Sequence, residues 1–128
     1  MEECPICKEH IEWSSLGVRD TYVVTCPRCG VYHITRTVGV NLRNNHFSNR
    51  VIANISGWLQ ENKIFEITSS NIENLERLKT PSFHERADKF LGHLEKETEF
   101  AGQILYNNNS WLGAGWCIND EELYELIR

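Results

Sequence analysis

The sequence lacks any long apolar run, any low-complexity tract and any linker rich in glycine, proline or serine. No window approaches the roughly 20 apolar residues that a membrane-spanning helix needs. The acidic start, Met1–Cys4, also lacks the apolar core of a secretion signal. We therefore expect a cytoplasmic, globular protein that inserts into no membrane.

A surplus of positive charge is missing as well. The formal net charge is -5, with seven Lys or Arg against six Asp or Glu in residues 1–63 and six against twelve in residues 64–128. Strong attraction to a nucleic-acid backbone requires a basic surface. This charge distribution argues against a protein built mainly to hold polyanions.

Cysteine is plentiful, and its spacing is the strongest pattern in the chain. The residues concerned follow the pattern C-x2-C-x18-C-x2-C, which is typical of a metal ion held by four thiolates: Cys4, Cys7, Cys26 and Cys29. A closed four-cysteine shell leaves no position for water or substrate. We therefore predict one structural Zn²⁺ per chain at these residues, and an iron ion with four sulfur ligands is the alternative.

Three other residues enter this interpretation. His10 and His33 lie near the cysteine pairs and could replace a ligand, although ordinary strand positions suit them better. The odd total of five cysteines argues against a disulfide framework. Cys117 is then left over, and we interpret it as a buried, inert thiol.

The two cysteine pairs resemble the knuckles of the zinc-ribbon and rubredoxin-like families. Pro5 and Pro27 follow the first cysteine of each pair, and Gly30 follows the second pair. The resemblance covers about 35 residues and implies a small zinc ribbon. It departs from the family pattern at Lys8, where a glycine is usual. We expect this knuckle to hold the lysine in a strained or altered turn.

Residues before about 40 favour short strands. Three segments are rich in β-branched and aromatic residues and are separated by turn residues: His10–Ser14, Thr21–Thr25 and Val31–Thr37. After residue 40 the apolar residues follow a helical period. The first predicted helix starts near Ser48 or Asn49, and its apolar stripe is Val51, Ile52, Ile55, Trp58 and Leu59.

Two further helices follow. A short one over Ile72–Leu78 is expected to have Ser69 or Ser70 as its cap and to end before Pro81. The next begins with a capping box, Ser82–Glu85, in which each side chain satisfies a helix N–H of the other residue. The residues of this helix that we expect to face the core are Ala87, Phe90, Leu91 and Leu94.

The end of the chain is less regular. Gln103–Tyr106 could be a strand, Asn107–Asn109 a turn, and Trp111–Trp116 either a tight helical turn or an extended segment. A last helix, capped by Asn119 or Asp120, carries the apolar stripe Leu123, Leu126 and Ile127. Because this helix is still amphipathic at its last residue, we expect a longer protein, with a docked terminal helix as the alternative.

Together these elements predict an α+β fold. We expect a zinc ribbon at residues 1–40 and a mostly helical domain at residues 41–128, which could be winged-helix-like. The candidate catalytic groups are scattered and match no hydrolase, P-loop or metalloprotease motif: His46, His84, Glu85, His93, Glu95, Glu97 and Glu99. We expect no enzyme.

Two functions fit these predictions. The first is a binding or sensor module that docks onto a protein or another domain of the same polypeptide, with Trp111 and Trp116 as interface anchors or, more simply, as core residues. The second is a nucleic-acid-binding regulator with a helix-turn-helix over residues 67–94. Its phosphate-contacting face would be Arg28, Tyr32, His33, Arg36, Arg43 and Arg50.

The segments Ile55–Leu59, Pro81–Leu91 and Asn119–Leu123, together with the ribbon, also resemble the N-terminal regions of bacterial multidomain proteins. In such proteins an effector domain follows, for example a TIR-type domain, and phage defence is proposed for some. The resemblance covers most of the chain and implies the sensing or adaptor end of a longer protein.

Overall fold

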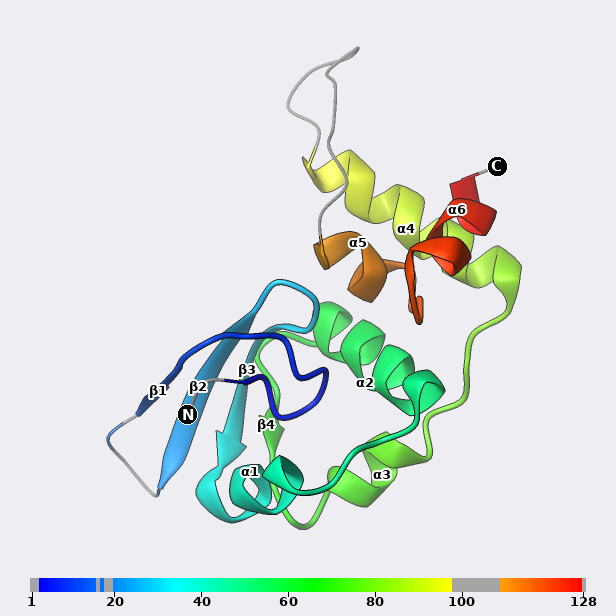
Figure 1. Ribbon diagram of the computed structural model, residues 1–128. Helices are drawn as coiled ribbons and strands as arrows, with labels where there is room; N and C mark the ends of the chain where they lie inside the picture. The colour runs from blue at the N-terminus through cyan, green and yellow to red at the C-terminus, as the bar shows by residue number, and fades with distance from the viewer. Residues whose placement is uncertain (1–2, 16, 18–19, 98–108, 128) are drawn as a thin grey trace.

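A computed structural model describes residues 3–15, 17, 20–97 and 109–127. It shows a four-stranded sheet in the N-terminal part, followed by helices (Figure 1). The predicted α+β class is therefore confirmed. Among the described residues, no helix has both the length and the apolar character needed to cross a bilayer.

The sheet has the order β1-β2-β3-β4. Its antiparallel part consists of β1 (Trp13–Ser15), β2 (Thr21–Cys26) and β3 (Gly30–Thr35), and β4 (Glu66–Ile67) pairs parallel to β3. The three predicted strands are present with shifted ends. The first starts later than predicted, because His10 instead forms an isolated bridge with Glu3.

The third strand ends earlier than predicted, since α1 (Arg36–Arg43) begins directly after it. The sequence analysis expected a strand to Thr37 and no helix here. Val38 and Leu42, one helical turn apart, are both buried in the core, so tertiary packing overrides the local strand preference. Gly39 lets the helix approach the ring of Trp13, because a Cβ there would lie 2.6 Å from Trp13 Cη2.

Helix α2 (Asn49–Glu61) starts where predicted, with the Ser48 hydroxyl accepting from the backbone N–H of Val51 at 3.3 Å. Helix α3 (Ile72–Glu76) is present, but neither Ser69 nor Ser70 caps it. Asn71 occupies the N-cap position, but its side chain makes no hydrogen bond to the helix. Instead the Asn71 side chain accepts from Thr68 N and donates to Glu66 O, both at 2.9 Å, and so closes the turn after β4.

Helix α4 (Phe83–Glu97) has the predicted capping box: the Ser82 hydroxyl accepts from Glu85 N at 3.2 Å, and Ser82 N donates to Glu85 Oε1 at 3.4 Å. Phe90 is buried, but Leu91 is 56% exposed. The prediction for Leu91 was wrong because it lies one helical step away from the buried face, on which Arg86 is buried instead.

Helix α5 (Asn109–Ala114) shows that Trp111 lies in a helical turn, and α6 (Asp120–Ile127) completes the fold. Asn119 is the cap of α6, since its side chain accepts from Glu122 N at 3.1 Å. The strand considered at residues 103–106 and the turn at residues 107–108 lie outside the described residues.

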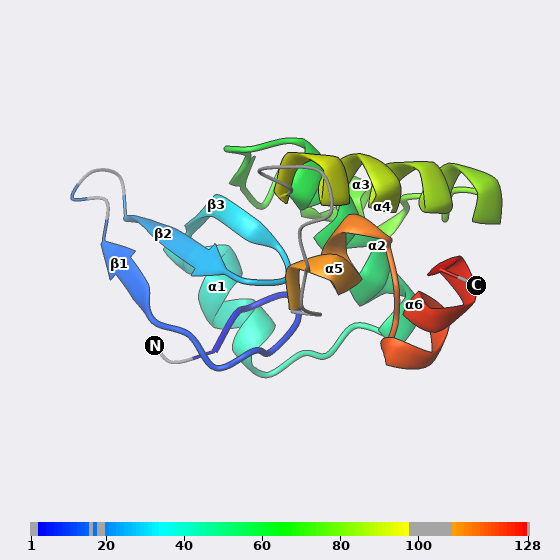
Figure 2. The same cartoon turned by 90° about the horizontal axis from the view of Figure 1, so that it is seen from above.

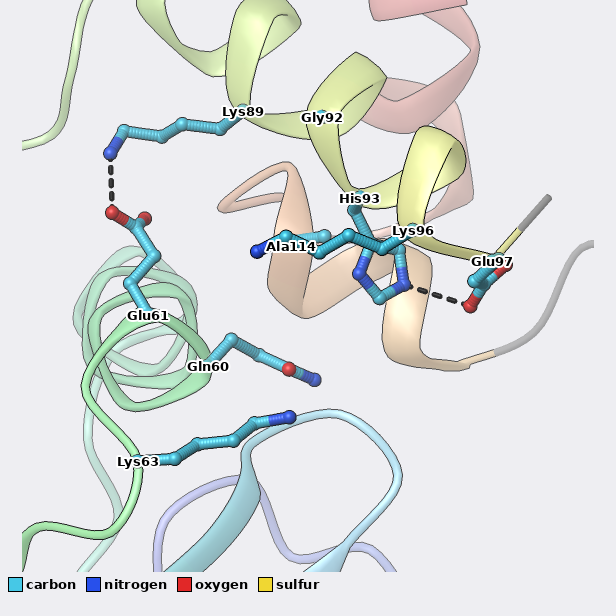
Figure 3. A pocket seen from close by; sticks show the side chains of 9 residues that line it. All are labelled: Gln60, Glu61, Lys63, Lys89, Gly92, His93, Lys96, Glu97 and Ala114. Atoms are coloured by element: carbon cyan, nitrogen blue, oxygen red, sulfur yellow. Dashed lines mark hydrogen bonds and ion pairs between the residues drawn. The ribbon is translucent and has the colours of Figure 1, made fainter. Parts of the chain in front are cut away.

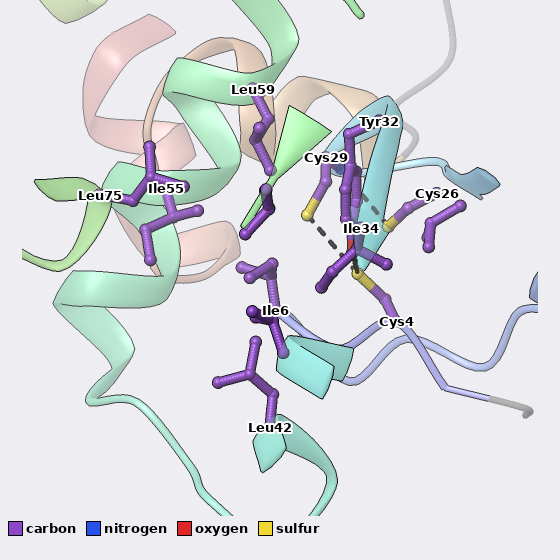
Figure 4. Packing of buried hydrophobic residues seen from close by; sticks show 13 residues of the cluster. Cys4, Ile6, Cys26, Cys29, Tyr32, Ile34, Leu42, Ile55, Leu59 and Leu75 are labelled. Carbon is purple, nitrogen blue, oxygen red and sulfur yellow. Dashed lines mark hydrogen bonds between the residues drawn. The ribbon is translucent and has the colours of Figure 1, made fainter. Parts of the chain in front are cut away.

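The buried apolar residues form two clusters. The sheet cluster, partly drawn in Figure 4, joins the strands, the first cysteine pair, α1, α2 and α3. The helix cluster joins α4, α5 and α6 around Phe90, Trp111, Cys117, Leu123 and Leu126. The domain boundary near residue 40 stays a prediction, but residues on both sides of it share the sheet cluster.

Helix α2 lies between the two clusters, packing on β3 on one side and on α5 on the other. Viewed from above, β1 to β3 and α1 lie at one end of the molecule, α5 lies near its middle and α6 lies at the other end (Figure 2). Helix α3 packs on α2, whereas α4 packs on α5 and α6. The expected helix-turn-helix would require α3 and α4 to pack together, and their apolar residues instead belong to different clusters.

Candidate metal centre

The four cysteines predicted as ligands lie together at one end of the sheet. Their sulfur atoms all lie within 4.8 Å of one another. The Sγ atoms of Cys4 and Cys29 are 3.8 Å apart, and those of Cys7 and Cys26 are 3.4 Å apart. A tetrahedron with metal–sulfur bonds of about 2.3 Å has sulfur atoms about 3.8 Å apart. The cluster therefore fits a single four-coordinate metal ion.

Both cysteine pairs are followed by a residue in the left-handed backbone region. Lys8 has φ 66° after the first pair, and Gly30 has φ 84° after the second. The altered turn expected at Lys8 is confirmed. The Lys8 ammonium group donates to Leu42 O at the end of α1, at 2.5 Å. Glycine suits the second position because it adopts this backbone conformation without strain.

Neighbouring polar groups support the sulfur atoms. The Tyr32 hydroxyl lies 3.0 Å from Cys4 Sγ, and the Ser56 hydroxyl of α2 lies 3.1 Å from Cys29 Sγ. The backbone N–H of Cys29 also points at Cys26 Sγ, 3.4 Å away. Donors of this kind offset the negative charge of metal-bound thiolates and orient them.

The charges of the four thiols are strongly linked. Burial raises the pKa of Cys29, and the hydrogen bond with Cys26 raises that of Cys7. Burial would also raise the pKa of Cys4, but hydrogen bonds from the other thiols and Tyr32 hold it below its usual value. Burial and the charge of Cys4 raise the pKa of Tyr32, which keeps its hydroxyl a donor. Four thiolates so close together require a cation among them.

The other residues considered near the site do not join it. In the described part of the chain, the group of possible metal ligands contains the four cysteines and neither histidine. His10 is exposed, and His33 lies on β3 opposite Val23. Cys117 is fully buried, and burial raises its pKa. It is an ordinary buried thiol, as predicted.

A second polar centre, which no sequence pattern predicts, joins the metal knuckle to the helix cluster. Three arginines donate to consecutive carbonyl groups of residues 115–117. Arg86 Nε binds Gly115 O at 3.0 Å, and Arg50 Nη1 binds Trp116 O at 3.3 Å. Arg28 Nη2, from the second knuckle, binds Cys117 O at 2.6 Å.

Glu122 compensates this arginine cluster. Its carboxylate pairs with Arg86 at 2.9 Å and with Arg50, and it accepts from the backbone N–H of Ile118 at 2.9 Å. Burial would raise the pKa of Glu122, but these partners hold it below its ordinary value. No motif in the sequence indicates this centre, since its members come from four separate segments.

These contacts correct the predicted phosphate-contacting face. Arg28 is only 9% exposed and Tyr32 is fully buried, so neither side chain can reach a phosphate group. Arg50 is paired with Glu122, while Arg36 and Arg43 are exposed. The six residues therefore do not form one surface.

The two tryptophans considered as interface anchors are core residues. Trp111 packs edge-on against Phe90 at 5.5 Å, and Trp116 lies against Gly57 of α2, where a Cβ would come within 2.3 Å of its ring. Their indole N–H groups donate to carboxylates: Trp111 to Glu97 at 2.9 Å and Trp116 to Glu61 at 2.6 Å. Buried tryptophans usually satisfy their N–H in this way.

Ser110, His93 and Glu97 lie together in a group that could be mistaken for a catalytic triad. Ser110 Oγ lies 3.1 Å from His93 Nε2, and Glu97 Oε1 lies 2.9 Å from the same nitrogen. In a serine-hydrolase triad the acid binds the other ring nitrogen, which frees Nε2 to take the serine proton. The shared nitrogen does not permit that relay.

Comparison with protein-family models, with curated proteins and with solved structures finds no match for this chain. The geometry of the cysteine cluster is consistent with a zinc-ribbon-like knuckle, and the resemblance to bacterial multidomain proteins stays a prediction.

Proposed function

We propose that the chain is a non-enzymatic binding module, acting as a cytoplasmic sensor or adaptor, in which one structural Zn²⁺ is bound by Cys4, Cys7, Cys26 and Cys29. The observation that carries the proposal is the closed cluster of four sulfur atoms within 4.8 Å. Zinc suits it because thiolates in a tetrahedral shell make a redox-silent site with no open position. The ion would tie the first knuckle to the sheet.

The binding role is supported by surface features of the helix cluster. Four large apolar side chains are more than half exposed on α4 and α6: Phe83, Leu91, Tyr124 and Ile127. Exposed apolar groups of this size suit contact with a protein or with another domain of the same polypeptide. The shared nitrogen of His93 in the Ser110 group supports a non-enzymatic role.

The alternative, a nucleic-acid-binding regulator, has less support. Its predicted phosphate contacts include the buried Arg28 and Tyr32. Its presumed recognition helix, α4, carries Glu85, Asp88, Glu95 and Glu97 against Arg86, Lys89 and Lys96. Arg86 is buried, so the remaining charges on this helix repel a phosphate backbone.

Elemental mass spectrometry of the purified chain tests the metal, and a salt-dependent titration with duplex and single-stranded nucleic acid tests the alternative. We expect one zinc per chain and no salt-dependent binding. Cys29→Ser should lose the zinc, and Cys117→Ala should keep it. Iron in place of zinc, or no metal, would overturn the metal assignment. Micromolar binding that weakens steeply with salt would favour the nucleic-acid function.

A further inference from the structure

A cavity of about 610 Å³ lies beside the second knuckle, between the end of α2, α4 and α5 (Figure 3). This size falls within the roughly 300 to 1,000 Å³ of small-molecule sites. Most of its polar lining comes from α4 and from the end of α2 and the residues after it: Gln60, Glu61, Lys63, Lys89, His93 and Lys96. The cavity is separate from the metal centre and from the arginine cluster.

The charges in this cavity do not balance. Both of its carboxylates already have partners: Glu61 pairs with Lys89 at 2.5 Å, and Glu97 pairs with His93 at 2.9 Å. Lys63 and Lys96 have no carboxylate partner among the residues that the structure describes. With histidine counted as neutral, three lysines and two carboxylates line the cavity, and the net charge of +1 attracts an anion into a concave site.

One wall of the cavity is held in place by the knuckle. The end of the Lys63 side chain lies over Gly30, with Lys63 Cε 2.9 Å from the position that a Cβ would occupy there. Gln60 is fixed by donating to Arg28 O at 2.9 Å. In Figure 3, the side chains of Gln60 and Lys63 extend from α2 and the residues after it, and that of Lys96 extends in the opposite direction from α4. A wall that is ordered before binding loses less conformational entropy when a ligand binds.

Gly92 keeps the opposite wall open. It lies within α4, where glycine costs about 1 kcal/mol relative to alanine. Nothing lies within 4 Å of the position that its Cβ would occupy, so packing does not require a glycine here. Residue 92 lines the cavity, and a larger side chain would project into it.

We propose that this cavity binds a small phosphate monoester about the size of a mononucleotide, with Lys63 and Lys96 contacting the phosphate. Such a group carries about -1.5 to -2 charges at neutral pH, which two ammonium groups balance. Lysine is a common partner of phosphate. The inference rests on the proposed sensor function and names the class of ligand sensed.

Calorimetric titration of the purified chain with adenosine monophosphate, adenosine and inorganic phosphate tests this proposal. We expect the nucleotide to bind and adenosine not to bind. Inorganic phosphate should compete with the nucleotide; if it binds equally well, the site recognises the phosphate group alone. The double variant Lys63→Gln with Lys96→Gln should weaken nucleotide binding at least about tenfold, and Lys79→Gln, an exposed lysine outside the cavity, should not change it.

Gly92→Leu is a second variant, which should block the cavity without removing a charge. Thermal melting shows whether Gly92→Leu folds. If it does not, the double lysine variant still tests the proposal, because Lys63 and Lys96 are exposed and their substitution should not disturb folding. No binding of either phosphate compound at millimolar concentration, or undiminished binding by the double variant, would overturn the proposal. Tighter binding of a single-stranded oligonucleotide, lost in the same variant, would instead assign the lysines to a polyanion.

Zinc content, measured on the same samples, separates this inference from the proposed function. Zinc without phosphate binding overturns the cavity assignment and leaves the metal centre intact. Phosphate binding without zinc supports the cavity and overturns the metal assignment.

Discussion

The sheet cluster and the helix cluster hold short elements together by different chemistry. In the sheet cluster the strands have two to six residues, and the segment before β1, the end of β2 and the turn that follows it supply four sulfur atoms suited to a metal ion. In the helix cluster, α5 and α6 have six and eight residues, and three arginines and Glu122 fix the segment between them. Elements this short bury little apolar surface each, so strong polar links supply what packing cannot.

The two clusters also meet directly. Helix α5 lies on the second knuckle so closely that a Cβ at Gly113 would come within 1.9 Å of Arg28 O. The Arg28 side chain continues from the knuckle to Cys117 O. Substitutions can therefore show whether the helix cluster folds when the metal centre is lost.

The largest expected effect comes from removing a ligand. Cys26→Ser should abolish metal binding and unfold the ribbon, because a structural zinc contributes about 10 to 16 kcal/mol in small zinc-dependent folds. Hydrogen exchange should become fast at Val24 and Ile34 of the sheet. Exchange at Phe90 will show whether the helix cluster depends on the knuckle, and we expect it to be accelerated less.

Cys117→Ala is the matched control, since it removes a buried thiol outside the metal centre. This variant should retain the metal, and hydrogen exchange in the sheet should remain slow. If Cys26→Ser melted like the parent protein and retained its metal, the four-cysteine site would be wrong.

The second prediction disturbs the contact between the two clusters and leaves the metal ligands unchanged. Gly113→Ala would place a Cβ against the knuckle backbone, which cannot move aside like a flexible side chain. We expect a loss of about 3 kcal/mol in the free energy of unfolding, as for severe overpacking, with unchanged zinc content. The measurement is urea denaturation monitored by tryptophan fluorescence.

Gly92→Ala is the control for the same change of residue. Open space surrounds that position, so the substitution should stabilise α4 by up to about 1 kcal/mol. Equal effects of the two alanines would mean that α5 does not pack on the knuckle as described.

The third prediction concerns the charge that compensates the arginines. Glu122→Gln keeps the shape of the side chain and removes its charge, which should cost about 1 to 2 kcal/mol at pH 7 from weakened charge-assisted hydrogen bonds. Because the folded-state pKa of Glu122 lies below its ordinary value of 4.5, its stabilisation is present above that value and is lost as pH falls through the folded pKa.

The difference in unfolding free energy between the parent protein and Glu122→Gln should therefore shrink below about pH 4.5. Acid also protonates the cysteines, but that loss is common to both proteins and cancels in the comparison. A difference that stayed constant down to pH 3 would show that the carboxylate charge does not matter.

More of the sheet cluster than of the helix cluster could be predicted from the sequence, and the reason is physical. The cysteine spacing is local and chemically specific, so it predicted the metal centre and the turn at Lys8. Helical periodicity and the Ser48 cap likewise predicted α2. These patterns record interactions between residues that are near one another in the chain.

The contacts of the arginine cluster join residues from 29 positions apart, for Arg86 and Gly115, to 89 positions apart, for Arg28 and Cys117, and arginine has no single preferred partner. Sequence reasoning therefore assigned Arg28 and Arg50 to the surface. Helix α1 was missed because Thr37 and Val38 favour strands locally, while burial of Val38 and Leu42 decides for a helix. Leu91 shows the reverse error, since an apolar residue does not have to be buried.

The smallest expected effect tests a local feature of the helix cluster alone. Ser82→Ala should cost about 1 kcal/mol, because the hydroxyl that accepts from Glu85 N at 3.2 Å is lost at the start of α4. Ser70→Ala is the control: that serine was predicted to cap α3 and does not, so its loss should change stability by less than about 0.5 kcal/mol. Hydrogen exchange should rise in α4 and stay unchanged in the sheet, because a cap stabilises only its own helix and whatever packs on it. Equal acceleration in both clusters would instead mean that they unfold as one unit, and that the contact of α5 with the knuckle outweighs the difference in chemistry between them.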